Sequence, residues 1–176
     1  AEMRHLNTDS DSEVLLNIFA HELGKQRAIL PSTKHFFQAV KKTHSRCHGA
    51  YAVLALITGF GLLAFRDPRG IRPLVIGERQ GKTQKEYIIA SENSSFSALG
   101  YTTLRDVAPG EAVFIDTLGQ LHSQQCADNP EPTPCLFEYV YLARPDSTLD
   151  QISVYKARMR MGKKLANKIT KLNPNH

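Results

Sequence analysis

A change in the spacing of apolar residues near position 50 constrains the fold of this chain more than any other feature. Residues 50–57 are apolar without interruption, a pattern typical of a strand covered on both faces. Thr58-Gly59-Phe60-Gly61 then indicates a turn, after which residues 62–65 resume the strand. Before position 50, apolar residues recur at helical spacing. Helices followed by several short strands predict an α+β fold rather than a parallel α/β sheet.

Two helices are predicted before the strands. Ser10-Asp11-Ser12-Glu13 has the pattern of a capping box, in which the first and fourth side chains bond to each other's backbone amides. Apolar residues follow at helical spacing as far as Leu23, and Gly24 provides a helix end. Residues 36–41 fit a second, shorter helix.

Further strands, a connector and a third helix are predicted over the rest of the chain. Three prolines within residues 126–134 indicate an extended connector. The predicted strands cover residues 74–76, 87–90, 113–115 and 137–143, and Gly119 marks another hairpin. A helix is predicted from about 149 to 172, with an apolar face made of Ile152, Tyr155, Met159, Leu165, Ile169 and Leu172.

Charge and composition exclude several classes of partner. The chain has 176 residues and a net charge of +5, and residues 155–171 carry basic side chains without an acid among them. Because this segment also has a regular apolar face and few aromatic residues, it predicts a solvated helix face rather than a nucleic-acid surface.

No apolar run approaches a membrane span, and residues 1–12 lack the apolar core of a signal peptide. Three cysteines without metal-ligand spacing indicate free thiols, so we expect a cytoplasmic protein.

Three segments resemble known families. The first, which resembles the glutaminase domain of the class II amidotransferases, is Arg66–Leu74 (RDPRGIRPL) followed by Ala90-Ser91-Glu92. The other two, which resemble the amidophosphoribosyltransferase family specifically, are Phe137–Ser147 (FEYVYLARPDS) and Val154–Arg158 (VYKAR) followed by Met161-Gly162. With Asn7–Glu13 near the start, the resemblance extends over nearly the whole chain.

The resemblance implies a fold and an activity. It implies part of a four-layer αββα class II glutaminase domain of the N-terminal-nucleophile type, followed by the start of an α/β phosphoribosyltransferase domain. Residues 1–125 would be the C-terminal part of the first domain, 126–148 the interdomain connector and the strand that leads into the second domain, and 149–176 the first helix of that domain. This family transfers ammonia from glutamine to phosphoribosyl pyrophosphate, which forms 5-phosphoribosylamine in the first step of purine synthesis. The resemblance also implies a homo-oligomer and a Mg²⁺ ion bound by the transferase half.

The nucleophile of this family is an N-terminal cysteine whose own α-amine can act as its base. The chain begins with Ala1, and Cys47, Cys126 and Cys135 are internal. We therefore expect no catalytic residue in this chain, which the resemblance identifies as an internal part of a longer enzyme that is inactive by itself. Cys135 lies near an iron–sulfur ligand position of some family members. The proline-rich sequence before it resembles the cluster-free branch, so we expect no cluster.

Asp11 is the candidate substrate-binding residue. Its local sequence indicates an acid in the first turn of a helix, where the helix dipole favours a negative charge. The resemblance assigns it a second role, in which its carboxylate pairs with the α-ammonium group of bound glutamine through charge-assisted hydrogen bonds. Asp9 is the nearby alternative, and we expect it to face solvent.

Two further groups of polar residues are candidates for structural or coupling roles. Arg66, Asp67 and Arg72 are expected to fix a tight loop between two strands through ionic hydrogen bonds, and Glu92 is expected to be structural as well. The resemblance places Tyr141, Arg144 and Asp146 where the two domains meet. There they would couple the two active sites or line the ammonia route, and the alternative is interdomain packing without a direct role.

Two other functions remain open. The chain could belong to a different class II amidotransferase, such as glucosamine-phosphate synthase or asparagine synthetase, although those enzymes do not share the segment Phe137–Ser147. It could also be a non-catalytic binding or regulatory module that kept the scaffold without the nucleophile.

Overall fold

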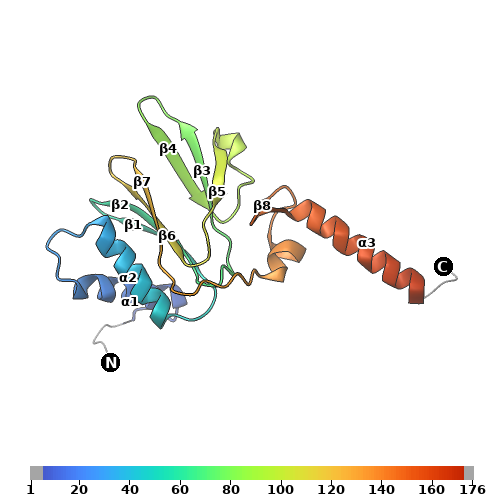
Figure 1. The fold of residues 1–176 in the computed structure, drawn as a ribbon, viewed down its shortest axis with the longest axis horizontal. Helices are drawn as coiled ribbons and strands as arrows, with labels where there is room; N and C mark the ends of the chain where they lie inside the picture. The colour runs from blue at the N-terminus through green and yellow to red at the C-terminus, as the bar shows by residue number, and fades with distance from the viewer. Residues whose placement is uncertain (1–5, 173–176) are drawn as a thin grey trace. The chain divides into compact units, whose positions relative to one another are not determined.

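A computed structural model describes residues 6–172 of the chain (Figure 1). Helices and antiparallel sheets are both present, so the predicted α+β class is confirmed. The chain divides into two compact units. Unit 1 comprises Ala1–Arg72 with Val107–Thr133, and unit 2 comprises Pro73–Asp106 with Pro134–His176. The assignment of residues 1–125, 126–148 and 149–176 to three parts of a two-domain enzyme stays a prediction.

Unit 1 is an antiparallel sheet of four strands with two helices on one face. The helices are α1 (Asp11–Lys25) and α2 (Thr33–Arg46), and the strand order is β1-β2-β6-β7 (Figure 1). The strands are β1 (Ala52–Ile57), β2 (Gly61–Arg66), β6 (Glu111–Asp116) and β7 (Leu121–Gln125). Alternate strand residues pack against the helices, and the buried core consists of Phe19, Phe36, Phe37, Ala39, Val40, Leu63, Phe65, Ala112, Phe114 and Cys126.

Both predicted helices exist, but their ends differ from the expectation. Ser10 is the N-cap of α1 and its hydroxyl accepts a hydrogen bond from the Ser12 amide. The Glu13 carboxylate does not complete a capping box with Ser10, because it binds amides further upstream. At the other end, Arg27 rather than Gly24 takes the left-handed conformation, with a φ of 51°.

The predicted hairpin at residues 50–65 is confirmed, although the strand is not covered on both faces. β1 pairs with β2 in antiparallel register, and it lies at an edge of the sheet. On the face away from the helices, Leu54 is 51% exposed and Leu56 is 79% exposed. A β-carbon at Gly61 would lie 2.1 Å from the carbonyl oxygen of Ile115, so this position requires glycine for the close approach of β2 and β6.

Unit 2 contains a second sheet and the C-terminal helix. Its sheet has the order β4-β3-β5, with β3 (Val75–Gln80), β4 (Lys85–Ala90) and β5 (Thr102–Asp106) all antiparallel. A short 3₁₀ helix, η1 (Ser97–Leu99), precedes β5. The sequence predicted β3 and β4, and it missed β5, whose residues include few of the apolar types that mark a strand.

The strand predicted for residues 137–143 is wrong. Residues Glu138–Leu142 form a single π-helical turn, η2, which the Ala143 amide closes by donating to the Glu138 carbonyl at 2.9 Å. A short apolar run fits a buried strand and a buried helical turn equally well by its pattern alone. The η2 turn was therefore not distinguishable from a strand before its partners were known.

The third helix starts later than predicted. Residues 148–153 form a hairpin of two very short strands, β8 (Thr148–Leu149) and β9 (Ile152–Ser153), and α3 runs over Val154–Leu172. The two loop residues Asp150 and Gln151 have φ angles of 47° and 64°, which is the backbone of a tight type I′ hairpin turn.

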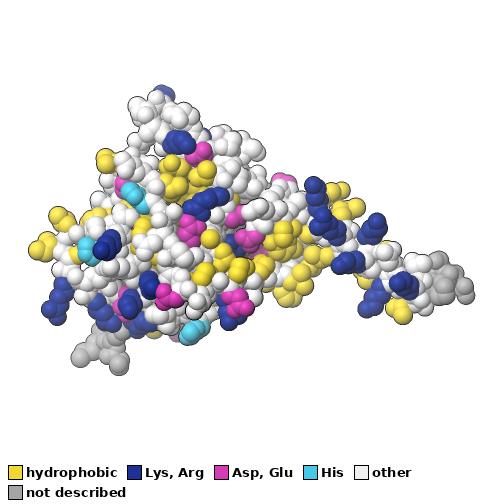
Figure 2. All heavy atoms as spheres, viewed as in Figure 1, with side chains coloured by type: hydrophobic (Ala, Val, Ile, Leu, Met, Phe, Trp, Pro, Cys, Tyr) yellow, Lys and Arg dark blue, Asp and Glu magenta, His cyan; other side chains and the backbone are white. Residues whose placement is uncertain are grey.

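Helix α3 packs only its first turns within unit 2. Val154 is buried with Tyr139, Ala143 and Leu149, and Ala157 and Met161 pack against them. The predicted apolar face is exposed instead, and its members are Ile152, Tyr155, Met159, Leu165, Ile169 and Leu172. Figure 2 shows apolar and basic side chains along this helix. None of the helices within residues 6–172 has the length and apolar character that crossing a membrane requires.

Candidate functional site

Asp11 lies at the N-terminal end of α1 with its carboxylate exposed to solvent. Within the described part of the chain, this carboxylate accepts a single long hydrogen bond, from the Ser12 hydroxyl at 3.4 Å. Most of its acceptor capacity is therefore open to a ligand. The geometry suits the pairing of Asp11 with an ammonium group, and its role as a glutamine contact stays a prediction.

Glu13 organises the segment that leads into Asp11. Its Oε1 accepts from the Asn7 amide at 2.8 Å, and its Oε2 accepts from the Thr8 amide at 2.8 Å and from the Thr8 hydroxyl at 2.6 Å. The bond from the Asn7 amide, followed by that from the Thr8 hydroxyl, lowers the pKa of Glu13 below its ordinary value. Both oxygens of Glu13 are thus occupied by its own chain. Asp9 is exposed, as expected.

The buried guanidinium group of Arg66 holds the loop after β2. Its side chain is only 1% exposed, and its guanidinium donates to the carbonyl oxygens of Arg72 at 2.6 Å, Val107 at 2.8 Å and Gly70 at 2.8 Å. Gly70 has a φ of 58°, and a β-carbon there would lie 2.7 Å from the ring of Pro109. The loop therefore needs both the buried guanidinium and the glycine.

The carboxylate of Asp67 binds backbone amides of the same loop. The residue is fully buried, and its carboxylate accepts from the backbone amides of Arg69 at 3.0 Å, Ile71 at 3.1 Å and Arg72 at 3.1 Å. Arg72 takes part through its backbone amide and carbonyl. The predicted structural role of Arg66 and Asp67 is confirmed, since their charged groups satisfy the polar backbone of a tight loop.

The connector candidates lie together in unit 2. Arg144 and Asp146 form a two-pronged ion pair, with Nε–Oδ1 at 3.0 Å and a second nitrogen 3.1 Å from Oδ2. The hydrogen bonds from Arg144 lower the pKa of Asp146, and those to Asp146 raise the pKa of Arg144. Tyr141 lies on η2 and its side chain is 78% exposed. All three side chains are available to a partner, and their coupling role stays a prediction.

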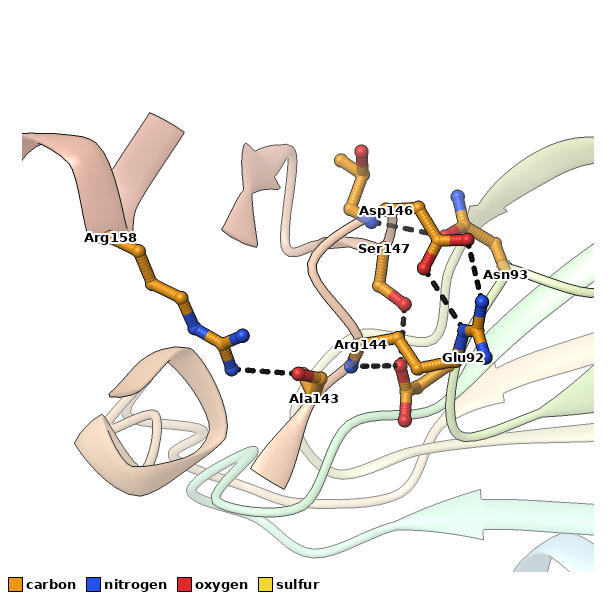
Figure 3. Close-up of polar contacts among 8 residues, drawn as sticks. Glu92, Asn93, Ala143, Arg144, Asp146, Ser147 and Arg158 are labelled. Atoms are coloured by element: carbon orange, nitrogen blue, oxygen red, sulfur yellow. Dashed lines mark hydrogen bonds and ion pairs between the residues drawn. The ribbon is translucent and has the colours of Figure 1, made fainter. Parts of the chain in front are cut away.

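Glu92 and Asn93 bind the backbone that carries this ion pair (Figure 3). Glu92 Oε2 accepts from the Arg144 amide at 2.8 Å and from the Ser147 hydroxyl at 2.5 Å. Asn93 Oδ1 accepts from the Thr148 amide at 3.0 Å. Two adjacent residues after β4 therefore hold a turn that lies more than fifty residues later in the chain.

Arg158 of α3 holds the same segment at its other end. Its Nε donates to the Tyr139 carbonyl at 2.8 Å, and a terminal nitrogen donates to the Ala143 carbonyl at 2.7 Å, which Figure 3 shows beside the Glu92 contacts. These bonds satisfy carbonyls that the end of a helical turn leaves open. The two segments that resemble amidophosphoribosyltransferases, 137–147 and 154–158, are thus joined physically.

The described residues offer no evident metal centre. Residues 6–172 contain no group of three or more His, Cys, Asp or Glu side chains placed to hold a metal ion. The three cysteines are free thiols: Cys126 is buried, whereas Cys47 and Cys135 are half-buried. Burial raises the pKa of the Cys126 thiol to about 11. A neutral, buried thiol is a poor nucleophile, and the expectation that Cys126 is not catalytic stays a prediction.

Reasoning from the sequence missed several residues of this arrangement. Ser147 and Arg158 lie inside the two segments that resemble amidophosphoribosyltransferases, so the motifs pointed to them without showing their bonds. Asn93 follows the Ala-Ser-Glu motif directly and had no signal of its own. Asp11 belongs to unit 1, whereas the group around Arg144 belongs to unit 2.

Comparison with known proteins gives a consistent family match. Residues 1–98 match the family model described as a glutamine amidotransferase domain. An amidophosphoribosyltransferase of Pseudomonas aeruginosa is 55% identical over 176 residues, which is 100% of this chain and 35% of that protein. An amidophosphoribosyltransferase of Escherichia coli is also 55% identical, over 96% of this chain and 34% of that protein.

A solved structure supports the same relationship. The glutamine phosphoribosylpyrophosphate amidotransferase from B. subtilis, in complex with ADP and GMP, aligns with a TM-score of 0.76 and 35% sequence identity. The alignment covers 94% of this chain and 33% of that one. The chain therefore spans about a third of the length of the curated relatives that it matches.

Proposed function

Because this chain belongs to the family of glutamine amidotransferase domains, we propose that it is part of an enzyme that transfers glutamine-derived ammonia to phosphoribosyl pyrophosphate. One observation carries the proposal: relatives named amidophosphoribosyltransferase match 96–100% of the chain, at 55% identity. The product is 5-phosphoribosylamine, in the first step of purine synthesis.

In the proposed reaction, ammonia released from the glutamine side chain attacks the anomeric carbon of phosphoribosyl pyrophosphate. The bond from that carbon to the pyrophosphate oxygen breaks, its electron pair leaves with pyrophosphate, and the new amine loses a proton. From the resemblance to amidophosphoribosyltransferases, we propose that Mg²⁺ binds the transferase half, where it would neutralise the charge of the leaving pyrophosphate.

Asp11 is the glutamine contact within this chain. Its exposed carboxylate, held at the start of α1 by the Ser10 cap and the Glu13 bonds, pairs with the α-ammonium group of the substrate. A charge-assisted hydrogen bond from an ammonium to a fixed carboxylate distinguishes a free amino acid from a glutamine within a peptide.

The 176 residues by themselves are proposed to be inactive in both half-reactions. Catalysis in this family needs a cysteine with a free α-amine, and the three cysteines here are internal.

The exposed Leu54 and Leu56 support the four-layer arrangement, since a second sheet packed on this face of β1 would cover them. A homo-oligomeric state, a cytoplasmic location and the absence of nucleic-acid partners and of an iron–sulfur cluster stay predictions.

Arg144, Asp146 and Tyr141 are proposed to couple the glutaminase and transferase sites. The support is their position in the connector segment and the exposure of all three side chains. The alternative, that they only pack between domains, predicts that their removal changes stability without changing how efficiently ammonia is used.

The decisive experiment measures the full-length protein with two nitrogen sources. We expect glutamine or ammonium chloride to support phosphoribosyl pyrophosphate-dependent release of pyrophosphate. In Asp11→Ala, the loss of one charge-assisted bond is expected to raise the KM for glutamine by roughly 10- to 150-fold, while the ammonium-dependent rate stays unchanged.

Asp9→Ala is the matched control, because Asp9 is an exposed aspartate two residues away. It is expected to leave the KM for glutamine unchanged. Equal effects of the two substitutions would contradict the role of Asp11. A wild-type protein without glutaminase or transferase activity would contradict the proposed reaction and would favour the alternative of a non-catalytic module.

A further inference from the structure

We propose that Glu92 is a positioning residue whose carboxylate fixes the turn that presents Arg144 and Asp146. A single oxygen, Oε2, accepts both from the Arg144 amide at 2.8 Å and from the Ser147 hydroxyl at 2.5 Å (Figure 3). Both donors come from the 144–148 turn, at the two ends of the Arg144–Asp146 ion pair. Glu92 thereby fixes the segment on either side of the ion pair and makes no hydrogen bond to the Asp146 carboxylate. We call this pair of bonds the Glu92 clamp.

The turn that carries Arg144 and Asp146 is held by Glu92, by Asn93 and by the first residues of α3. The turn closes on itself through the Ser147 amide, which donates to the Arg144 carbonyl at 3.1 Å. The side chains of Arg144 and Asp146 are 67% and 54% exposed, whereas Ser147 is buried. Exposed turns of this kind are mobile unless their backbone is tied down. The two bonds to Glu92 and the Asn93 bond to the Thr148 amide provide side-chain ties. The Val154 and Tyr155 amides add backbone ties by donating to the Ser147 and Pro145 carbonyls, each at 3.1 Å.

The chemistry of Glu92 fits an acceptor rather than a packing residue. The side chain is half-buried, and it accepts from the Arg144 amide and the Ser147 hydroxyl, both neutral donors. Glutamine has the same length and keeps one oxygen that can accept two hydrogen bonds. Alanine keeps neither the length nor the oxygen. Glu92→Gln should therefore preserve the turn, and Glu92→Ala should release it.

The consequence for function rests on the proposed function, in which Arg144 and Asp146 couple the two active sites. Releasing the turn is expected to leave glutamine hydrolysis intact and to lower the fraction of ammonia that reaches phosphoribosyl pyrophosphate. A purely structural role of Glu92 predicts something different, namely a loss of stability with no change in that fraction.

The experiment uses the full-length protein with Glu92→Ala, Glu92→Gln and the control Glu86→Ala. Glu86 is a matched control because it lies on β4, is 42% exposed and binds Arg79 rather than the turn. The measured quantity is the amount of glutamate formed per phosphoribosylamine formed, with ammonium-dependent synthesis measured in parallel. We expect this ratio to rise roughly 2- to 30-fold in Glu92→Ala, the range of coupling changes that single residues produce. Glu92→Gln and Glu86→Ala should stay near the wild-type ratio, and ammonium-dependent synthesis should be unchanged in all variants.

Amide hydrogen exchange gives a second readout that is independent of catalysis. The Arg144 amide is expected to exchange roughly tenfold faster or more in Glu92→Ala, since it loses a bond to a charged acceptor. A wild-type ratio together with wild-type exchange at Arg144 would overturn the proposal. If Glu92→Ala does not fold, Ser147→Ala decides, because it removes only the hydroxyl donor. An unchanged ratio in Ser147→Ala then overturns the proposal.

Failure of this inference is distinguishable from failure of the proposed function. If wild-type protein makes no phosphoribosylamine from glutamine, the function is wrong, and accelerated exchange in Glu92→Ala still supports the clamp. If wild-type protein is active and every variant keeps both its ratio and its exchange rate at Arg144, the clamp is wrong and the function stands.

Discussion

Replacing Arg66 with methionine would remove three hydrogen bonds that hold the loop between β2 and β3. The guanidinium donates to the carbonyl oxygens of Arg72, Val107 and Gly70 at 2.6–2.8 Å, and the side chain is only 1% exposed. Methionine keeps much of the length and volume of the side chain but donates no hydrogen bond. The main effect is therefore three buried carbonyls without their donor.

The expected cost follows from these contacts. A buried polar group that loses its partner costs about 1–3 kcal/mol, and removing the guanidinium also removes its own cost of burial. We expect Arg66→Met to lower the free energy of unfolding by about 3–5 kcal/mol. For a domain of this size, each kcal/mol shifts the Tm by about 2–4 °C, so the Tm should fall by about 6–20 °C.

Scanning calorimetry of the wild type, Arg66→Met and Arg69→Met would test this magnitude. Arg69 is the matched control, because it lies in the same loop with its side chain exposed. Surface substitutions of this kind usually change stability by at most about 0.5 kcal/mol. The reasoning is refuted if the two variants have the same Tm, or if Arg66→Met unfolds within about 2 °C of the wild type.

Two further predictions concern buried titratable groups of unit 1. Burial lowers the pKa of His44 from 6.5 to about 4, so the unfolded chain binds a proton that the folded chain does not as the pH falls through this range. The free energy of unfolding should therefore have its full value above pH 6.5 and be about 2 kcal/mol lower at pH 5. Urea titrations of the wild type and of His44→Gln would measure this difference. The same pH dependence in both proteins would contradict the prediction. Burial also raises the pKa of the Cys126 thiol to about 11. Iodoacetamide at pH 8 should therefore modify the half-buried Cys135 before it modifies Cys126, and mass spectrometry of the folded protein would show the order. Equal rates at the two cysteines would contradict the burial of Cys126.

Several elements could be predicted from the sequence because their signals are local. The N-cap at Ser10, the helix that follows it and the hairpin across Gly61 depend on residues only a few positions apart. The structural role of Arg66 and Asp67 was also accessible, since two opposite charges around a proline and a glycine indicate a tight, ion-stabilised loop. The family resemblance, rather than a local signal, made Asp11 and the 137–147 segment candidates before any contact was known.

Only the tertiary structure decided what those candidates bind. Residues 137–143 fit a strand equally well by their pattern, whereas Glu138–Leu142 form a π-helical turn. Arg158, about one turn into α3, donates to the Tyr139 carbonyl of this turn and to the Ala143 carbonyl that follows it. Glu92 has no local signal for its partners, which lie more than fifty residues later in the chain. Periodicity and capping patterns report short-range preferences, whereas these bonds depend on where distant segments come together. The sequence therefore determined the class of fold and the family resemblance, and the packing of distant segments decided the geometry of the connector.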